Sequence, residues 1–178
     1  MLRAAALTLL CVASQVAAAA LQEYQVKAVF LFNFTQFVDW PTAAFTDASE
    51  PIVICVLGKD PFGSYLDDAV RDERVDNRRL VVRRLTRGDE IDACRVLFIS
   101  QSETAQLDAI IARARALRAL TVSDASGFGE RGGMVGFVTE DNRVRLRINP
   151  DAAKAAGLTI SSKLLRVAEL VGTPEGAR

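Results

Sequence analysis

The sequence contains no histidine among its 178 residues. That absence removes the usual base of a serine or cysteine nucleophile and the commonest metal-ligating side chain. The G-x-S-x-G pattern of a hydrolase and the Walker A pattern of a phosphate-binding loop are absent as well. No group of residues assembles a catalytic site, so we predict that the protein is not an enzyme and holds neither a metal nor a cofactor.

An excess of charge of either sign is also missing. Lysine and arginine number 22, aspartate and glutamate number 22, and the formal net charge is zero. Nucleic-acid-binding proteins usually have an excess of basic residues, which this balance does not give, so no nucleic-acid partner is expected. Half of the residues are hydrophobic, which is enough for the core of one domain of this length. After residue 20 no apolar run reaches the length of a membrane span, so we expect no direct membrane insertion.

The first 20 residues have the composition of an export signal. A short basic start ending at Arg3 precedes an apolar stretch from Ala4 to Val16, and four alanines, Ala17 to Ala20, close the segment. This pattern is typical of a cleavable secretory signal peptide, and an uncleaved anchor is the alternative. We therefore predict a signal peptide at 1–20 and a single exported domain at 21–178.

Two cysteines remain after such a cleavage, Cys55 and Cys94. An even pair in an exported chain indicates a disulfide, with two buried free thiols as the alternative. A zinc ion would be under-ligated by two thiolates without histidine. Cys55 lies in a strand-like apolar run and Cys94 just precedes another. Neighbouring strands could bring the two sulfur atoms within bonding range.

Strand-like and helix-like patterns alternate along the chain. Strands are predicted at 52–57, 80–85, 96–99 and 120–122, and helices at 23–38 and 62–70. A third helix is expected after a capping box at Ser100 to Glu103 and carries an apolar stripe from Leu107 to Leu117. A fourth starts at Asn149-Pro150 and ends at Gly157, and Ser161 or Ser162 caps a last one whose apolar residues reach Leu170. Two further strands, 134–139 and 144–148, flank a turn and form a hairpin. This order predicts an α/β fold: a largely parallel sheet flanked by helices, with an antiparallel hairpin at one edge, in a flavodoxin/Rossmann-like sandwich.

The first predicted helix is rich in aromatic residues and apolar on more than one face. Val26, Phe30, Phe34 and Phe37 follow helical spacing, while Phe32 falls on another side. A helix of this kind is either buried or covered by a partner. Core packing and a partner-facing surface are therefore both open for these aromatic residues.

A glycine-rich segment, 127–136, precedes the predicted hairpin. Its start, Gly127 to Gly132, matches the dinucleotide fingerprint G-x-G-x-x-G. The fingerprint needs a helix N-terminus directly after the glycines, whereas a strand-like run follows here and Glu130 stands where phosphate would approach. We interpret the segment as a tightly turned loop.

Several short motifs together resemble a known family. They are Tyr24-Gln-Val-Lys-Ala-Val-Phe30 with Asp39-Trp40-Pro41, Ile54 to Gly58, Cys94 to Ser100, Leu120 to Asp124, Gly127-Phe128, Gly132-Gly133, Ile148-Asn149 and Gly157 to Leu165. In combination they resemble the YfiR-like family of periplasmic proteins over nearly all of the chain after residue 20.

The resemblance implies a periplasmic homodimer with an α/β sandwich. It implies repression of an inner-membrane diguanylate cyclase through the periplasmic domain of that enzyme, which lowers cyclic-di-GMP and biofilm formation. A periplasmic small-ligand-binding sensor is the alternative function, and an enzyme is a third class that only measured turnover would support. If the protein is a repressor, we expect the hairpin and the glycine-rich loop to face the partner, with Phe128 and Met134 as apolar contacts; edge packing is their alternative role.

The resemblance also bears on the cysteines. The cysteine pair of the family falls on Cys55 and Cys94. Some members carry a second, redox-sensitive pair, which falls near Gly129 and Gly136. This sequence has glycine at both positions, so the resemblance does not extend to a second disulfide.

Overall fold

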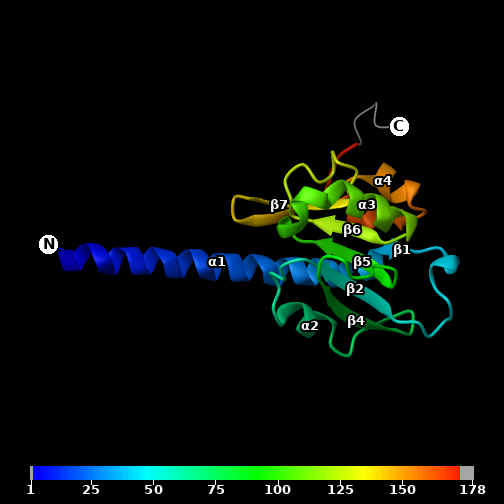
Figure 1. Cartoon of the computed structure of the whole chain (residues 1–178), viewed down its shortest axis with the longest axis horizontal. Coiled ribbons are helices and arrows are strands. Elements are labelled where there is room, and N and C mark those ends of the chain that lie inside the picture. The colour runs from blue at the N-terminus through cyan, green and yellow to red at the C-terminus, as the bar shows by residue number, and fades with distance from the viewer. Residues whose placement is uncertain (1, 173–178) are drawn as a thin grey trace.

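The computed structural model describes the backbone of residues 2–172 and the side chains of residues 20–172. Figure 1 shows one body of helices and strands from which the N-terminal half of the first helix extends. The elements are α1 (Leu2–Phe37), β1 (Val38–Asp39), η1 (Thr42–Ala44), β2 (Ile52–Leu57), α2 (Tyr65–Val70), β3 (Arg74–Val75), β4 (Arg78–Leu85), β5 (Cys94–Ile99), η2 (Gln101–Gln106), α3 (Leu107–Ala116), β6 (Leu120–Ser123), β7 (Val135–Glu140), β8 (Arg143–Ile148), α4 (Pro150–Ala155), β9 (Thr159–Ile160), α5 (Ser162–Leu165) and β10 (Glu169–Leu170).

An eight-stranded sheet organises the body, in the order β10-β8-β7-β6-β5-β2-β4-β3. The five strands β4-β2-β5-β6-β7 are parallel, and β7 and β8 form the antiparallel hairpin. In chain order the parallel strands run 2-1-3-4-5, which is the flavodoxin-like arrangement. The predicted fold class is therefore confirmed. The hairpin is not the outermost element at its end of the sheet, because β10 pairs in parallel with β8 and forms the edge strand.

Each face of the sheet has its own core. On one face α1, α2 and α4 pack over a cluster that includes Leu31, Phe34 and Phe98. On the other face α3 covers a second cluster, in which Ile111 and Leu97 are buried. Strands β2, β5 and β6 are buried along their whole length, as expected for strands that are covered on both sides.

The structure joins Cys55 and Cys94 in the predicted disulfide, with 5.7 Å between the two Cα atoms. A bulge in β5 makes this possible. Cys94 and Val96 pair with consecutive residues of β2, so Arg95 is the extra residue. The bulge reverses the alternation of side chains, and Cys94 then faces the same core as Cys55. Arg95 instead pairs with Glu50 at 2.9 Å.

The predicted last helix is shorter than its pattern indicated. It begins after Ser161, whose hydroxyl accepts from the backbone N–H of Lys163, but it ends at Leu165. Glu169 and Leu170 leave the helix and form β10. Pairing with the open edge of β8 satisfies backbone groups that a further helical turn would have satisfied within the helix, so tertiary context overrides the helical spacing here.

The predicted signal peptide forms the first part of α1 in the uncleaved chain. The side chains of residues 1–19 lie outside the described part, and cleavage after Ala20 stays a prediction. Within the described residues, no helix combines the length and apolar character needed to cross a bilayer.

Candidate functional site

The usual ligand crevice of this strand order is filled by side chains. It should lie between the carboxyl ends of β2 and β5, where the strand order reverses. There the backbone N–H of Lys59 donates to the hydroxyl of Ser102 at 3.0 Å. A Cβ placed on Gly58 would lie 2.4 Å from that oxygen. Glu103 is buried beside it and pairs with Arg87 at 3.3 Å. Side chains therefore occupy the space between the carboxyl ends of β2 and β5.

A pocket of about 330 Å³ lies one strand further along, beyond the end of β6. Strand β6 stops at Ser123 and pairs with β7 only through Val135 and Gly136, whereas β7 continues to Glu140. The hairpin thus overhangs the end of β6. Residues of α1 and of the loop after β6 line the space beyond that end, together with the overhanging part of β7. The short β6 is the structural cause of the pocket.

A buried charged cluster forms one wall. Lys27 is only 2% exposed and lies on α1 one turn after Glu23, whose carboxylate is 2.6 Å from the lysine Nζ. The same Nζ lies 2.8 Å from Oδ2 of Asp124, the first residue after β6. The Tyr24 hydroxyl donates to that Oδ2, also at 2.8 Å. A buried ammonium needs such partners, because an unpaired charge in the interior is strongly unfavourable.

The cluster perturbs the titration of Tyr24. Burial raises the pKa of its phenol, and the hydrogen bond to Asp124 and the negative charge of that carboxylate raise the pKa further. Lys27 also lies 4.4 Å from the centre of the Tyr24 ring, a cation–π distance. Tyr24 therefore remains a neutral donor that holds Asp124 in place over the ordinary pH range.

The burial of Phe128 and Met134 favours their alternative role, packing at the edge of the sheet, over partner contacts. Phe128 is 2% exposed and Met134 is 0% exposed. The Phe128 ring packs on Gly133, where an added Cβ would lie 2.3 Å from a ring carbon. Both side chains are core residues in this structure, and neither presents a surface to a partner. Phe128 instead contributes an apolar wall to the pocket.

The glycine-rich loop does not serve as a dinucleotide site. Strand β7 follows the glycines, so the helix N-terminus that the fingerprint requires does not occur there. Gly129 and Gly136 both line the pocket. A Cβ on Gly136 would meet only the neighbouring Arg147, at 3.7 Å, so this position has room for a side chain. The absence of side chains at these two positions keeps the pocket open.

The aromatic residues of the N-terminal region pack into the core. The Phe34 ring stacks on Phe30 and on Phe137 of β7, with ring centres 6.2 Å and 6.0 Å apart. The Phe30 ring is tilted against Phe137 at 6.0 Å. Phe37 and Trp40 are partly buried against the same cluster. This arrangement favours core packing over a partner surface for the aromatic residues.

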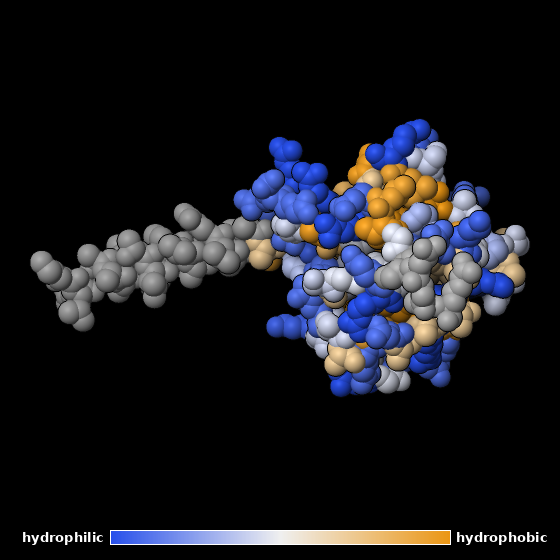
Figure 2. Space-filling view, turned by 90° about the horizontal axis from the view of Figure 1, so that it is seen from above, coloured by the Kyte–Doolittle hydropathy of each residue, from blue (hydrophilic) through white to orange (hydrophobic). Residues whose placement is uncertain are grey.

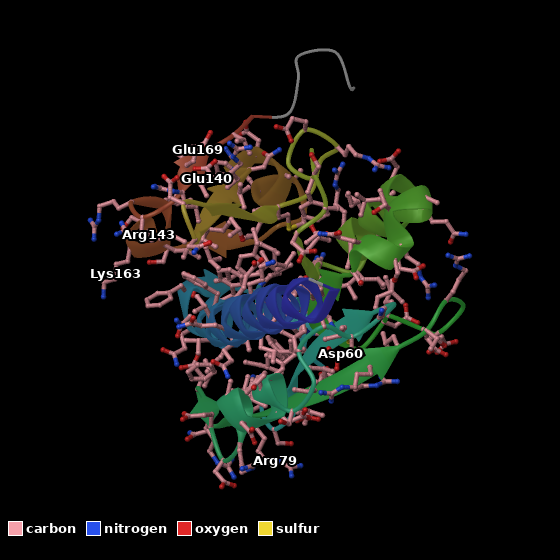
Figure 3. The ribbon with its side chains drawn as sticks, turned by 90° about the vertical axis from the view of Figure 1, so that its left-hand side faces the viewer. Asp60, Arg79, Glu140, Arg143, Lys163 and Glu169 are labelled. Atoms are coloured by element: carbon pink, nitrogen blue, oxygen red, sulfur yellow. A yellow bond between two sulfur atoms is a disulfide. The ribbon has the colours of Figure 1, made fainter. Side chains whose placement is uncertain are left out.

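A separate exposed surface lies around β10. Val167 is 72% exposed and Leu170 is 57% exposed, and Figure 2 shows an apolar patch in this region with charged groups beside it. The charges belong to an ion-pair network: Arg147 pairs with Glu169 at 2.9 Å and with Glu140 at 3.5 Å. Figure 3 shows Glu140, Arg143 and Glu169 on the same side of the molecule. We refer to this region as the β10 surface. It comprises Val167, Leu170, Glu140, Arg143 and Glu169.

Sequence reasoning did not find the buried cluster. Tyr24 and Asp124 are 100 residues apart, and no local pattern joins them. One signal was present: Lys27 is a charged residue on the side of α1 that carries Leu31 and Phe34. A charge on a buried helix face needs a partner, and an aspartate directly after a buried strand is a suitable one. Among residues 20–172 no group of three or more acidic, cysteine or histidine side chains is placed to hold a metal ion.

Comparison with known proteins identifies one family and one similar fold. The sequence matches a family described as YfiR/HmsC-like over residues 24–169. No curated protein matches the chain. A solved structure of a conserved domain protein from Vibrio cholerae O1 biovar El Tor strain N16961 is similar, with a TM-score of 0.50 and 14% sequence identity. The match covers 66% of this chain and 54% of that one, so this chain spans about half the length of the Vibrio protein. At this identity the likeness concerns the fold alone.

Proposed function

This chain belongs to the YfiR/HmsC-like family of periplasmic regulators, and on that premise we propose that it represses a membrane-bound diguanylate cyclase. The mature protein binds the periplasmic domain of the cyclase, keeps the enzyme inactive, and so lowers cyclic-di-GMP and biofilm formation. The family match over residues 24–169 is the observation that carries this proposal. The regulatory rather than catalytic character of the family supports a role without turnover.

The two edges of the sheet suggest where the cyclase binds. At the β3–β4 edge, Arg79 and Arg83 are exposed, and Figure 3 shows Arg79 at the far end of the body from Glu169. Charged residues of one sign on an edge discourage pairing with another chain. At the opposite edge, the β10 surface offers two exposed apolar side chains beside a charged network. An apolar centre with a polar rim is the usual composition of a protein interface, so we assign cyclase binding to the β10 surface.

Binding represses the cyclase only if it discriminates between the two states of the enzyme. A ligand with equal affinity for the active and inactive states shifts no equilibrium. The repressor must therefore contact the inactive arrangement of the periplasmic domain more favourably. Rigid anchors suit this requirement, and Leu170 is held in register by the pairing of β10 with β8.

The test is capture of the cyclase by the mature protein from solubilised membranes, with the captured enzyme identified by mass spectrometry. Replacing both Val167 and Leu170 with aspartate places charges at the centre of the proposed interface. We expect this variant to bind at least about thirtyfold more weakly, since an interface anchor contributes about 2 kcal/mol or more. Val29→Asp is the matched control, because Val29 is 51% exposed on α1 and lies outside the β10 surface. Equal capture by all three proteins would contradict the assignment.

We also propose that the mature protein is a homodimer, as the family resemblance implies. Analytical ultracentrifugation of the purified protein tests this directly. A single species with the mass of a dimer is expected, and a monomer at micromolar concentration would contradict it.

A periplasmic small-ligand sensor is the second candidate function, and the pocket beyond β6 is the observation that favours it. Its volume, about 330 Å³, lies at the lower end of the range of small-molecule sites. The pocket is bordered by α1, and Arg147 lines it while also pairing with Glu169 of the β10 surface. A bound molecule could therefore influence the surface that we assign to the cyclase.

A further inference from the structure

We propose that the pocket beyond the end of β6 binds a small molecule that carries an ammonium group on a compact apolar body. Asp124 accepts the hydrogen bond from the ammonium, and the side chains of Phe128 and Phe137 contact the apolar body. This inference goes beyond repression of a cyclase and does not rest on it.

The first support is an open acceptor on Asp124. Its side chain is only 5% exposed, and its Oδ2 already accepts from both Tyr24 and Lys27. No donor within residues 20–172 contacts Oδ1, although Asp124 lines the pocket. An ionised carboxylate can accept hydrogen bonds at both of its oxygens, and Oδ1 is not among the buried atoms of the described residues that lack a partner, so it is accessible to a donor from outside. Oδ1 of Asp124 therefore accepts a hydrogen bond from a donor that enters the pocket.

The second support is the charge of the pocket lining. Three carboxylates, those of Glu23, Asp124 and Glu130, face two cations, Lys27 and Arg147. The lining thus has an excess of one negative charge. Arg147 is engaged by Glu169 and Glu140, and Lys27 by Glu23 and Asp124. A cationic ligand neutralises the excess, whereas an anion would add a second unpaired negative charge in a partly buried site.

The third support is the apolar part of the wall. Phe128 and Phe137 are 2% and 4% exposed, and both line the pocket together with Val171. These side chains give a small ligand an apolar surface to pack against, while Asp124 fixes its orientation. The pocket thus combines an apolar wall with charged groups, and polar groups that fix orientation beside an apolar surface are typical of a small-molecule site. The volume of about 330 Å³ sets a limit on size and excludes a dinucleotide.

The experiment measures binding of three matched probes to the mature protein by isothermal titration calorimetry. Phenethylamine carries the ammonium, 2-phenylethanol replaces it with a neutral hydroxyl, and 3-phenylpropionate replaces it with an anion. We expect the amine to bind at millimolar or lower concentration. The alcohol and the anion should bind at least roughly tenfold more weakly, since hydrogen bonds between charged groups are about twice as strong as neutral ones.

Two variants address the site itself. Asp124→Asn keeps the shape but removes the charge, and should weaken amine binding at least roughly tenfold, in line with the value of a charge-assisted hydrogen bond. Gly136→Val fills the pocket from a strand position where a Cβ has room, and should abolish binding while the protein still folds. The control is Asp92→Asn, which alters a half-exposed carboxylate that pairs with Arg113 of α3; it should bind the amine as the wild type does.

Three outcomes would overturn the proposal. They are equal affinity for the three probes, unchanged amine binding in both the Asp124→Asn and Gly136→Val variants, and no amine binding at millimolar concentration. Because the assay uses the isolated protein, its result is independent of whether a cyclase is captured. A failed capture with successful amine binding would support the sensor function without repression.

Discussion

Reducing the Cys55–Cys94 disulfide should remove a large part of the stability of this protein. The bond closes a loop that spans 39 residues and contains α2, β3 and β4. In the chain-entropy model a loop of this length restricts the unfolded chain by about 4 kcal/mol at 25 °C. Typical domains have a net stability of only about 5–15 kcal/mol, so the bond accounts for a substantial fraction of it.

The native state itself should survive reduction. Strands β2 and β5 remain joined by their parallel pairing, and both cysteines are fully buried within the core under α3. We therefore expect reduction to lower the stability by giving the unfolded chain more conformational freedom, and not by breaking native contacts. For a domain of about 150 residues, a change of about 4 kcal/mol corresponds to a fall in Tm of roughly 8–16 °C.

The assay is urea unfolding of the mature protein, oxidised and reduced, followed by circular dichroism. Reduction is performed in denaturant before refolding, because the buried sulfur atoms are not accessible in the native state. The Cys55→Ala/Cys94→Ala variant is the control, and its stability should not depend on reductant. If the oxidised and reduced proteins differ by less than about 1 kcal/mol, the entropic reasoning is wrong for this loop. Free thiols in the untreated exported protein would refute the bond itself.

Three further predictions concern other parts of the chain. Gly133→Ala should lower the free energy of unfolding by about 1–3 kcal/mol in chemical denaturation, because the added methyl group overlaps the Phe128 ring; an unchanged midpoint would contradict this. The raised pKa of Tyr24 predicts stability that is present below about pH 10 and is lost as the pH rises above it, since the unfolded phenol ionises first; Tyr24→Phe should show a shallower alkaline decline, and parallel declines would refute it. Export should yield a protein whose intact mass starts at Leu21, whereas a full-length product would exclude cleavage after Ala20.

The sheet was predictable from sequence because its central strands are buried on both faces. Runs such as 52–57 and 96–99 are continuous apolar segments, and this pattern depends on little beyond their own composition. The disulfide was predictable because only two cysteines follow the predicted signal peptide. The bulge at Arg95 was not, because the shift in register depends on how β5 pairs with β2.

The candidate site was less accessible to sequence reasoning. Its pocket results from the difference in length between β6 and β7, and the charged wall joins α1 to a residue about 100 positions away. Strand β10 shows the same limit. Leu170 extends the apolar pattern of the predicted last helix, and the strand follows only from the open edge of β8. The burial of Phe128 could not be predicted from the sequence, because it depends on Gly133, which lies across a tight loop.

The central claim is repression of a diguanylate cyclase, and the most direct measurement is cellular cyclic-di-GMP after deletion of the gene. The account predicts that cyclic-di-GMP rises in the deletion strain, that the wild-type gene restores the lower level, and that the Val167→Asp/Leu170→Asp variant does not. Unchanged cyclic-di-GMP in the deletion strain, with no cyclase recovered by the mature protein, would contradict the account.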